Sequence, residues 1–462
     1  MPTECTPKLF EFEAVERRAV VAQFDGGTIT SNAGALLLGQ VDRGLGLMRR
    51  FARCFTDRRD PRFVEHSVET LVGQRVFGLV LGYEDLNDHD ELRKDPVFAV
   101  LAGKLKPVLR TDCEAVAGKS TLNRLEHTPK RNGAKYHKID CNGDEVDAFL
   151  VDVFMEAHKR PPRQIVLDVD ATDIPLHGHQ EGRFFHGYYD NYCYLPLYVF
   201  CGRELLLAKL RRSNIDASAG AVAEIARIVA HIRRRWPRVR IILRADSGFA
   251  REALMHWCET NGVDYVLGLA RNSRLEEALA THLSRAERQC TATGKAARLF
   301  RDFHYCTNET WSRKRRVVGK AEHTPKGANP RFVVTSLRRA AFDARALYED
   351  LYCARGEAEN RIGEQFELWA DRASSATMAA NQLRLWFSAI AYVLITAMRR
   401  IALRDTQFAD AAAATIRLKL LKLGARVRTS VRRIHFAIAS SCPNQHEFAT
   451  AHLALKRAFS SA

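Results

Sequence analysis

The sequence predicts an α/β protein with a mixed sheet flanked by helices, because short β-branched segments alternate with amphipathic helical segments through its middle. The expected strands are residues 165–170, 194–200, 204–210, 238–245 and 264–269, and the expected helices are 218–236 and 251–261. Each strand segment is short and rich in Val, Ile and Leu, whereas the helical ones repeat apolar residues every three to four positions. Neighbouring strands followed by strand–helix alternation favour a sheet with antiparallel and parallel pairs.

Three regions are expected along the chain. Residues 1–160 are predicted to form a mostly helical domain, which ends at the pair Pro161-Pro162. Residues 161–403 form the α/β region, with a β-rich insertion at about 285–340 and long helices over 344–370 and 376–403. Residues 404–462 are expected to be a basic helical region, because basic residues recur from Arg417 to Arg433 without an acid between them.

The charge balance favours a polyanionic partner. Lys and Arg total 71 against 54 Asp and Glu, which gives a net charge of +17 and a pI near 9.5. Basic side chains that neutralise phosphates release condensed counterions, so such a surplus favours nucleic acid. The plainer alternative is a basic protein with no nucleic-acid partner.

Cysteine usage and hydropathy indicate a soluble cytoplasmic protein. The 11 cysteines form no C-x-x-C pair, which is typical of reduced thiols rather than of a zinc ribbon or a disulfide framework. The N-terminal residues lack the apolar segment of a secretory signal. The apolar run 385–398 is shorter than the roughly 20 residues that span a bilayer, so it is predicted to be a buried helix, and no membrane partner is expected.

Three acidic residues are candidate catalytic metal ligands: Asp170, Asp246 and Glu359. The two Asp residues close predicted strands, where side chains project into the crevice at the edge of an α/β sheet, and Glu359 lies in a predicted helix. Carboxylate oxygens suit Mg²⁺, and a pair of such ions promotes in-line phosphoryl transfer. The plainer readings are a turn or helix-capping role for each Asp and a solvated position for Glu359. Asp168 shares a strand face with Asp170, so either could be the first ligand.

Tyr352 and Arg355 precede Glu359 by spacings that place all three on one helical face. An Arg one turn from a metal-binding Glu could contact a phosphate bidentately, and the Tyr hydroxyl could donate to a phosphate oxygen. The alternative is an ordinary polar stripe on an amphipathic helix.

A resemblance covers nearly the whole chain. YCARGEAEN, which carries Tyr352, Arg355 and Glu359, resembles the Y-R-E signature of DDE-type bacterial insertion-sequence transposases. LDVDATD at 167–173 and LRADSGFA at 243–250 resemble the two Asp blocks of that superfamily. FDGGTITSNAGALLL, GKSTLNRLE, HGHQEGRFFHGYYDNYCYLPLYVF and NPRFVVTSL resemble more narrowly the insertion-sequence family numbered thirteen-eighty, whose transposase DDE domain is of group 1.

The resemblance implies an RNase H-like catalytic domain that uses two Mg²⁺ ions, for which Mn²⁺ can substitute. It also implies that the helical domain over residues 1–160 binds DNA. It implies that the partner is double-stranded DNA, both the terminal inverted repeats and the target DNA. A homodimer would cut and join this DNA in the bacterial cytoplasm, in association with the nucleoid. Trp311 in the insertion would hold a base flipped from the duplex, with Arg315 and Arg316 contacting DNA beside it. The alternative for Trp311 is a core residue.

One position departs from the family pattern. The pattern expects a Lys seven residues after the Glu, and the residue there is Phe366. Two rival functions stand beside a cut-and-paste transposase. One is a nuclease without strand transfer, and the other, which Phe366 favours, is a decayed or repurposed transposase that only binds DNA.

Overall fold

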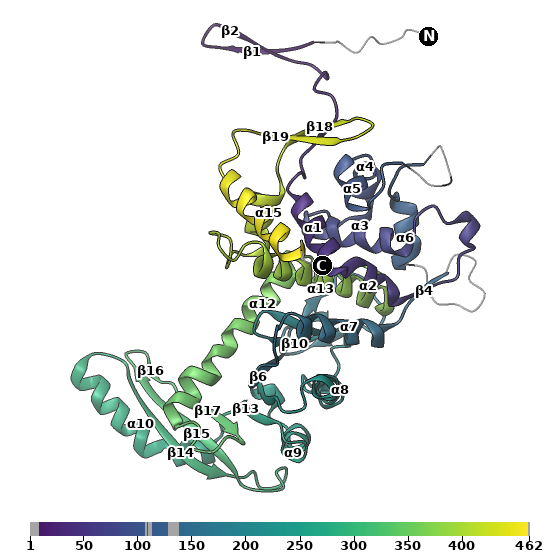
Figure 1. Ribbon diagram of the computed structural model, residues 1–462. Helices are drawn as coiled ribbons and strands as arrows, with labels where there is room; N and C mark the ends of the chain where they lie inside the picture. Colours follow the sequence, from purple (N-terminus) through teal and green to yellow (C-terminus); the bar gives the residue numbers. More distant parts are fainter. Residues whose placement is uncertain (1–8, 107–108, 110–112, 128–137, 461–462) are drawn as a thin grey trace. The chain divides into compact units, whose positions relative to one another are not determined.

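The computed structural model describes residues 9–106, 109, 113–127 and 138–460 (Figure 1). The chain divides into two compact units. The sheet unit comprises Arg53–Thr56 and Glu126–Thr396, and the flanking unit comprises Met1–Ala52, Asp57–Leu125 and Ala397–Ala462. The N-terminal and C-terminal segments thus belong to the same unit. The three-part functional division of the chain remains a prediction.

The sheet unit is built on a nine-stranded mixed sheet in the order β11-β10-β6-β12-β13-β17-β15-β14, with β16 paired to β15. Its strands are β6 (Gln164–Ala171), β10 (Leu197–Cys201), β11 (Glu204–Lys209), β12 (Arg240–Ala245), β13 (Asp264–Leu269), β14 (Ala297–Tyr305), β15 (Arg315–Thr324), β16 (Gly327–Ala328) and β17 (Arg331–Thr335). β6 pairs antiparallel with β10 and parallel with β12, which is itself parallel to β13. The mixed sheet predicted from the sequence is confirmed.

The insertion extends this sheet and does not form a separate one. β17 pairs antiparallel with β13, and β15 and β14 follow outward. The insertion also opens with a long helix, α10 (Ser273–Thr293), where strand-rich texture was expected from about residue 285. Asn272 caps this helix by accepting a hydrogen bond from the amide of Leu275 at 3.0 Å. Leu279 then packs onto Gly319 of β15, where a Cβ would meet it at 2.9 Å.

Helices cover both faces of the central strands. Alternate residues of β6, including Leu167 and Val169, join one apolar core with α8 (Ala221–Arg235) and α9 (Glu252–Thr260). The opposite face, which carries Ile242 and Val266, packs against the segment that follows the insertion. Burying such a side chain contributes about 1.5–3 kcal/mol. Because strand residues alternate in direction, the even-numbered residues of β6 and β12 face that segment.

The predicted helix over 344–370 is broken into four pieces. They are α11 (Ala344–Ala346), the π-helical η4 (Leu347–Tyr352), the 3₁₀ turn η5 (Cys353–Arg355) and α12 (Gly356–Glu367). Single π turns inside helices occur frequently at functional sites. The irregular part contains Tyr352 and Arg355 and leads directly to Glu359.

The second predicted long helix is α13 (Met378–Ile401). By length and composition it could cross a membrane, yet 72% of its most apolar window is buried inside the protein. Within the sheet unit, its Tyr392 packs edge-on against Phe200 of β10 and donates a hydrogen bond to the carbonyl of Arg203 at 2.8 Å. The buried position expected for the run 385–398 is confirmed.

The flanking unit is largely helical. Its principal helices are α1 (Ala35–Leu45), α2 (Leu47–Arg53), α3 (Val68–Val80), α4 (His89–Leu92), α5 (Pro96–Leu101), α6 (Lys119–His127), α14 (Ala413–Ile416) and α15 (Gln445–Phe459), the ends of α2 and α6 reaching the unit boundary. The C-terminal α15 packs on α1, where a Cβ on Gly44 would meet the ring of Phe459 at 2.3 Å. This contact explains why the two ends of the chain share one unit.

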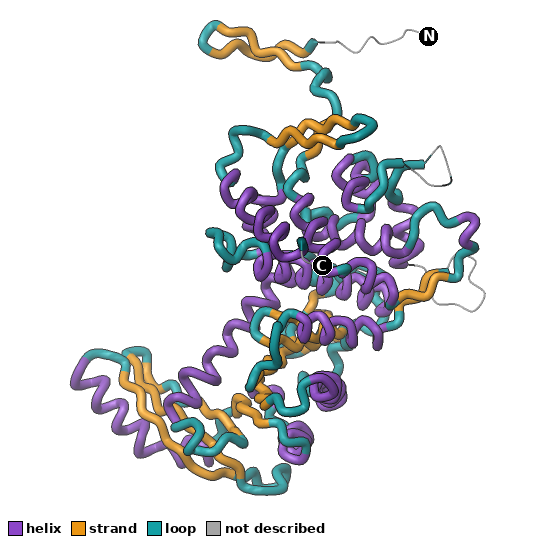
Figure 2. The backbone as a smooth tube through the Cα atoms, viewed as in Figure 1, coloured by secondary structure: helices purple, strands orange, loops and turns teal. Residues whose placement is uncertain are grey.

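The basic C-terminal stretch corrects the prediction of a helical tail. After η6 (Arg417–Leu421), the chain forms an antiparallel hairpin of β18 (Ala425–Thr429) and β19 (Ile434–Ile438), and β3 (Ile29–Thr30) pairs with β18 (Figure 2). The physical reason is the period-two alternation of apolar and basic residues in β18, which suits a strand with one buried face.

The remaining short elements complete the description. They are β1 (Phe10–Val15), β2 (Arg18–Ala22), β4 (Phe55–Asp57), η1 (Pro61–Phe63), η2 (Leu86–Asp88), β5 (Ile139–Cys141), α7 (Gly143–Glu156), β7 (Ile174–Pro175), β8 (Phe184–His186), β9 (Asn191–Tyr194) and η3 (Ser247–Phe249).

Candidate active site

Asp170 and Asp246 lie at the same ends of two adjacent parallel strands. Val169 of β6 is in register with Ala245 of β12. The next residues, Asp170 and Asp246, are therefore neighbours on the same face of the sheet. Asp170 is 8% exposed. Asp246 accepts a hydrogen bond from the amide of Gly248 at 2.9 Å and so caps the short turn η3. Asp246 therefore has the capping role considered from the sequence, and it also lies beside Asp170.

Glu359 is connected to this pair through Arg355. The guanidinium donates from Nη1 to Asp170 Oδ2 at 3.2 Å and from Nη2 to Glu359 Oε1 at 2.7 Å. The side chain of Arg355 is 20% exposed, and that of Glu359 is 60% exposed. The helical spacing predicted the Arg355–Glu359 contact, and the long-range contact to β6 is what brings Glu359 to the two strand ends.

The electrostatics of the cluster are those of carboxylates that share a site. Burial raises the pKa of Asp170 to about 6, Arg355 opposes that shift, and Asp246 and Glu359 add to it by repulsion. Like charges in a confined site disfavour joint ionisation unless a cation compensates them. Arg355 supplies the compensating charge in this structure.

The Tyr352 hydroxyl lies against Gly268 of the sheet, where any larger residue would collide with it. A Cβ on Gly268 of β13 would lie 2.5 Å from the Tyr352 hydroxyl oxygen and 2.8 Å from the amide nitrogen of Ser247. Burial raises the pKa of the Tyr352 hydroxyl, and Arg355 opposes that shift partly through a side-chain hydrogen bond. Gly268, Ser247, Tyr352 and Arg355 line one cavity. Sequence analysis missed Gly268, because a glycine inside a strand gives no sign of the ring that covers it.

Asp168 has a different role from Asp170. Both of its oxygens accept hydrogen bonds from Arg244, from Nε at 2.5 Å and from Nη2 at 2.8 Å. Arg244 also donates from Nη1 to the carbonyl of Leu351 at 2.6 Å. The pair is buried and ties β6 and β12 to η4, one residue before Tyr352. Of the two Asp residues, Asp168 is thus held by Arg244, whereas Asp170 contacts Arg355.

The donor set has the chemistry that Mg²⁺ prefers, namely hard carboxylate oxygens with mutual repulsion to relieve. Among the described residues, however, no three His, Cys, Asp or Glu side chains are gathered closely enough to hold a metal ion. The guanidinium of Arg355 bridges Asp170 and Glu359 where a cation would be expected. The residues therefore fit the metal by chemistry, and in this structure the Arg355 guanidinium lies between two of the carboxylates.

The three predicted DNA-positioning residues of the insertion lie in contacts within the protein. Trp311 is 9% exposed and packs edge-on against Tyr305. Arg315 donates to Glu252 and Glu259, and its guanidinium lies over the Trp311 ring. These contacts correct the expectation that Trp311 and Arg315 are available to DNA, because both complete the core and its buried charge pairs.

Arg316 is occupied in the same manner. Its guanidinium donates to both oxygens of Asp302 and to the carbonyls of Leu337 and Phe342. The exposed cations of this region are instead Arg313, Lys314, Arg338 and Arg339, which line a cavity with Glu259. Of these, Arg313 forms an ion pair with Glu259.

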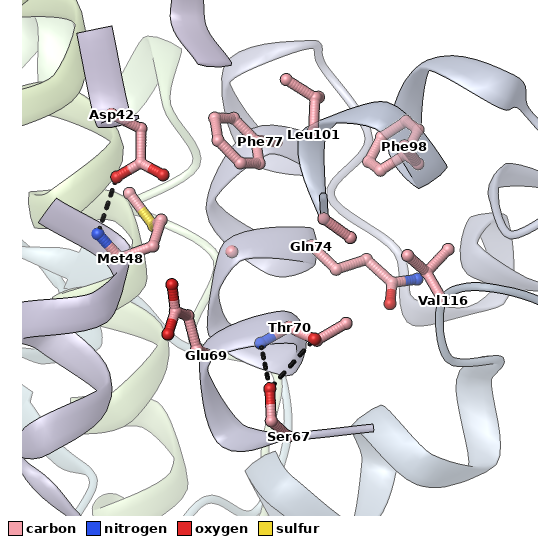
Figure 3. Close-up of a pocket in the computed structure, with 12 residues that line it drawn as sticks. Asp42, Met48, Ser67, Glu69, Thr70, Gln74, Phe77, Phe98, Leu101 and Val116 are labelled. Atoms are coloured by element: carbon pink, nitrogen blue, oxygen red, sulfur yellow. Dashed lines mark hydrogen bonds between the residues drawn. The ribbon is translucent and has the colours of Figure 1, made fainter. Parts of the chain in front are cut away.

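Another cavity lies in the flanking unit (Figure 3). It is lined by apolar side chains such as Met48 and Phe77 and by polar ones such as Thr70 and Gln74. Its carboxylate Asp42 accepts a hydrogen bond from the amide of Met48 at 2.8 Å, and burial raises the pKa of Asp42. The cavity brings no pair of strand-end carboxylates together, so the sheet unit carries the better candidate site.

Comparison with known proteins matches a family model and several solved chains. A family model described as transposase DDE domain group 1 matches residues 12–460. A search of the curated proteins found no match. The piggyBac transposase, solved as a synaptic complex with hairpin DNA, is 11% identical with a TM-score of 0.40, over 84% of this chain and 80% of that one.

Proposed function

We propose, on the premise that this chain belongs to the transposase DDE domain group 1 family, that it binds the terminal inverted repeats of an insertion sequence and moves that element by cut-and-paste transposition. The reaction is metal-dependent DNA cleavage followed by strand transfer. The finer assignments are the Y-R-E branch and the insertion-sequence family numbered thirteen-eighty. The branch rests on the sequence block around Arg355, and the narrower family rests on the blocks at 24–38, 118–126, 177–200 and 329–337.

The observation that carries the proposal is that Arg355 links two carboxylates from distant parts of the chain, beside the strand end that carries a third. Asp170 and Asp246 end adjacent parallel strands, and Arg355 links Asp170 to Glu359. Carboxylates so placed are the usual ligands of divalent ions in phosphoryl transfer. The strand order, with antiparallel β10 beside β6 and parallel β12 and β13 beyond it, supports an RNase H-like assignment.

Asp170, Asp246 and Glu359 would hold two Mg²⁺ ions, with Mn²⁺ as substitute. Bound divalent ions supply Lewis acidity to the attacking and leaving oxygens of the phosphodiester. Asp170, with a pKa of about 6, is ionised at neutral pH and available as a ligand. Arg355, once released from the carboxylates, would contact the phosphate through its two parallel N–H groups. Tyr352 would donate its hydroxyl proton in a hydrogen bond to a phosphate oxygen.

Double-stranded DNA is the proposed partner, as terminal repeat and as target. The surplus of positive charge supports this partner, since phosphate contacts supply most of the affinity of DNA-binding proteins. A homodimer that pairs the two element ends, in the bacterial cytoplasm at the nucleoid, completes the proposal.

The test is cleavage of a labelled duplex that carries the element's own terminal repeat, with Mg²⁺, Mn²⁺ or EDTA. We expect nicking at the repeat boundary only with metal. Asp246→Asn and Glu359→Gln should abolish nicking while leaving DNA binding in EDTA nearly unchanged, because each removes a metal ligand. Glu357→Gln, on the same helix and exposed, is the matched control and should cleave normally. Full cleavage by Asp246→Asn would remove Asp246 from the site.

Two other outcomes would favour the rival functions. Cleavage products that never join a target would indicate a nuclease without strand transfer. Tight DNA binding without cleavage under any metal would indicate a decayed transposase. Phe366 is the feature that favours this second rival, and Phe366→Lys would then be the first variant to test for restored cleavage.

A further inference from the structure

The basic hairpin, residues 425–438, has two chemically distinct faces. Ala425 and Val427 are buried, and Phe436 and Ile438 pack against the same small apolar core. The alternate residues of both strands point the other way and are exposed. The hairpin is therefore anchored through one face and presents the other.

The presented face and the turn carry only positive or neutral side chains. The exposed basic residues are Arg426, Arg428, Arg432, Arg433 and His435. Among the residues that the structure describes, no carboxylate forms an ion pair with any of these five. The sequence has no Asp or Glu between Asp410 and Glu447. The charge is thus unneutralised, in contrast to that of the insertion.

The outer part of the hairpin is a two-stranded ribbon with an ordered tip. β3 pairs only with Ala425 and Arg426, so from Arg428 outward the ribbon is two strands wide. The turn is closed by Ser430, whose amide donates to the carbonyl of Arg433 at 2.9 Å. Val431 at the tip has a relative exposure of 105%, so an apolar side chain projects fully into solvent between arginines.

We propose that this hairpin is a DNA-docking element that enters a groove of the duplex, with its arginines on the flanking phosphates and Val431 against the base edges. A two-stranded β-ribbon fits the major groove, and apolar side chains contact thymine methyl groups or base steps inside grooves. The inference rests on the proposed function, which makes duplex DNA the partner. It adds a binding surface separate from the carboxylate site.

The test measures the affinity of the full chain for a duplex by fluorescence anisotropy in EDTA over a range of salt concentrations. The hairpin variant is the triple substitution Arg428→Gln, Arg432→Gln and Arg433→Gln. Losing three phosphate contacts should make the salt slope about 2–3 less negative and weaken binding on the order of 100-fold at ~0.1 M salt. The matched control replaces the exposed Arg234, Arg235 and Arg238 of the sheet unit by Gln and should change the slope much less.

A second variant tests groove entry itself. Val431→Ser should weaken binding several-fold with the salt slope unchanged, because it removes a base-edge contact and no charge. A Val431→Ser chain that binds like the unmodified chain would overturn groove entry. A triple variant whose DNA affinity has an unaltered salt slope would overturn the whole inference. A triple variant that keeps its affinity for DNA but no longer binds anionic lipid vesicles would also overturn it.

Failure of this inference is distinguishable from failure of the proposed function. If the unmodified chain binds no duplex and cleaves none with Mg²⁺ or Mn²⁺, the proposed function fails and the hairpin inference fails with it. If the unmodified chain cleaves and the hairpin variants bind DNA as it does, only the hairpin inference fails.

Discussion

The insertion and the basic hairpin contain arginine runs that look alike in the sequence and differ completely in the folded protein. Arg315 and Arg316 of the insertion are buried and donate to Glu252, Glu259 and Asp302. Arg428 and its neighbours in the hairpin are exposed and have no carboxylate partner among the described residues. The difference shows that the density of positive charge in a sequence does not identify the DNA-binding surface.

The two runs differ because, in the part of the chain that the structure describes, acidic side chains from elsewhere lie beside the insertion arginines and not beside the hairpin arginines. Glu252 and Glu259 come from α9 and lie within reach of β15 because both elements pack on the same sheet. The hairpin is remote in sequence from any acid and packs on an apolar core. Paired arginines therefore hold the fold together, whereas unpaired ones are available to a polyanion.

The largest effect is expected where both the arginine and its carboxylate partner are deeply buried. Arg244→Met should lower the free energy of unfolding by about 3–5 kcal/mol, because it leaves the buried carboxylate of Asp168 without its partner. Chemical denaturation measures this loss. Arg240→Met on the same strand is the control, since the Arg240–Asp264 pair is largely exposed and should contribute less than about 1 kcal/mol. Equal losses of stability in the two variants would contradict the larger contribution expected from the buried Arg244–Asp168 pair.

A smaller loss is expected in the insertion. Arg315→Ala should cost about 2–3 kcal/mol, less than the full value for a buried pair, because Glu252 is partly exposed and can be hydrated. Affinity for DNA should not change. The Arg428, Arg432 and Arg433 triple variant should behave in the opposite manner, with stability within about 0.5 kcal/mol of the unmodified chain. An Arg315→Ala chain that keeps its stability and loses DNA affinity would break the comparison.

The smallest effect concerns a buried histidine beside an arginine. Burial, and then the Arg75 guanidinium, lowers the pKa of His89 to about 3. The unfolded chain binds this proton near the ordinary pKa of 6.5, so the stability is complete above that pH and declines as the pH falls. Between pH 7.5 and 5.5 the loss is about 1.4 kcal/mol. Denaturation at both pH values measures it, and His89→Gln should flatten the dependence by that amount.

Local sequence patterns predicted much of the fold. Five strands of the nine-stranded sheet, those between residues 164 and 269, and the two helices among them were expected from periodicity, and they are present within a few residues. The breaks at η4 and η5 were not expected, because the apolar spacing of 344–370 gives no sign of them. In the folded protein the π turn packs against Ile242 and Val266. The basic hairpin was not predicted, because the prediction used the positive charge of the segment and not the alternation of apolar and basic residues that is typical of a strand.

The sequence by itself determined the family, the three site carboxylates as candidates and the positive charge of the chain, because these depend on residue identity and local order. Only the tertiary structure decided that Asp168 serves Arg244 while Asp170 faces Glu359, and that Arg315 is internal while Arg428 is exposed. Both decisions depend on which elements pack together. A strand places Asp168 and Asp170 on one face, but only the helix laid across that face determines the partner of each.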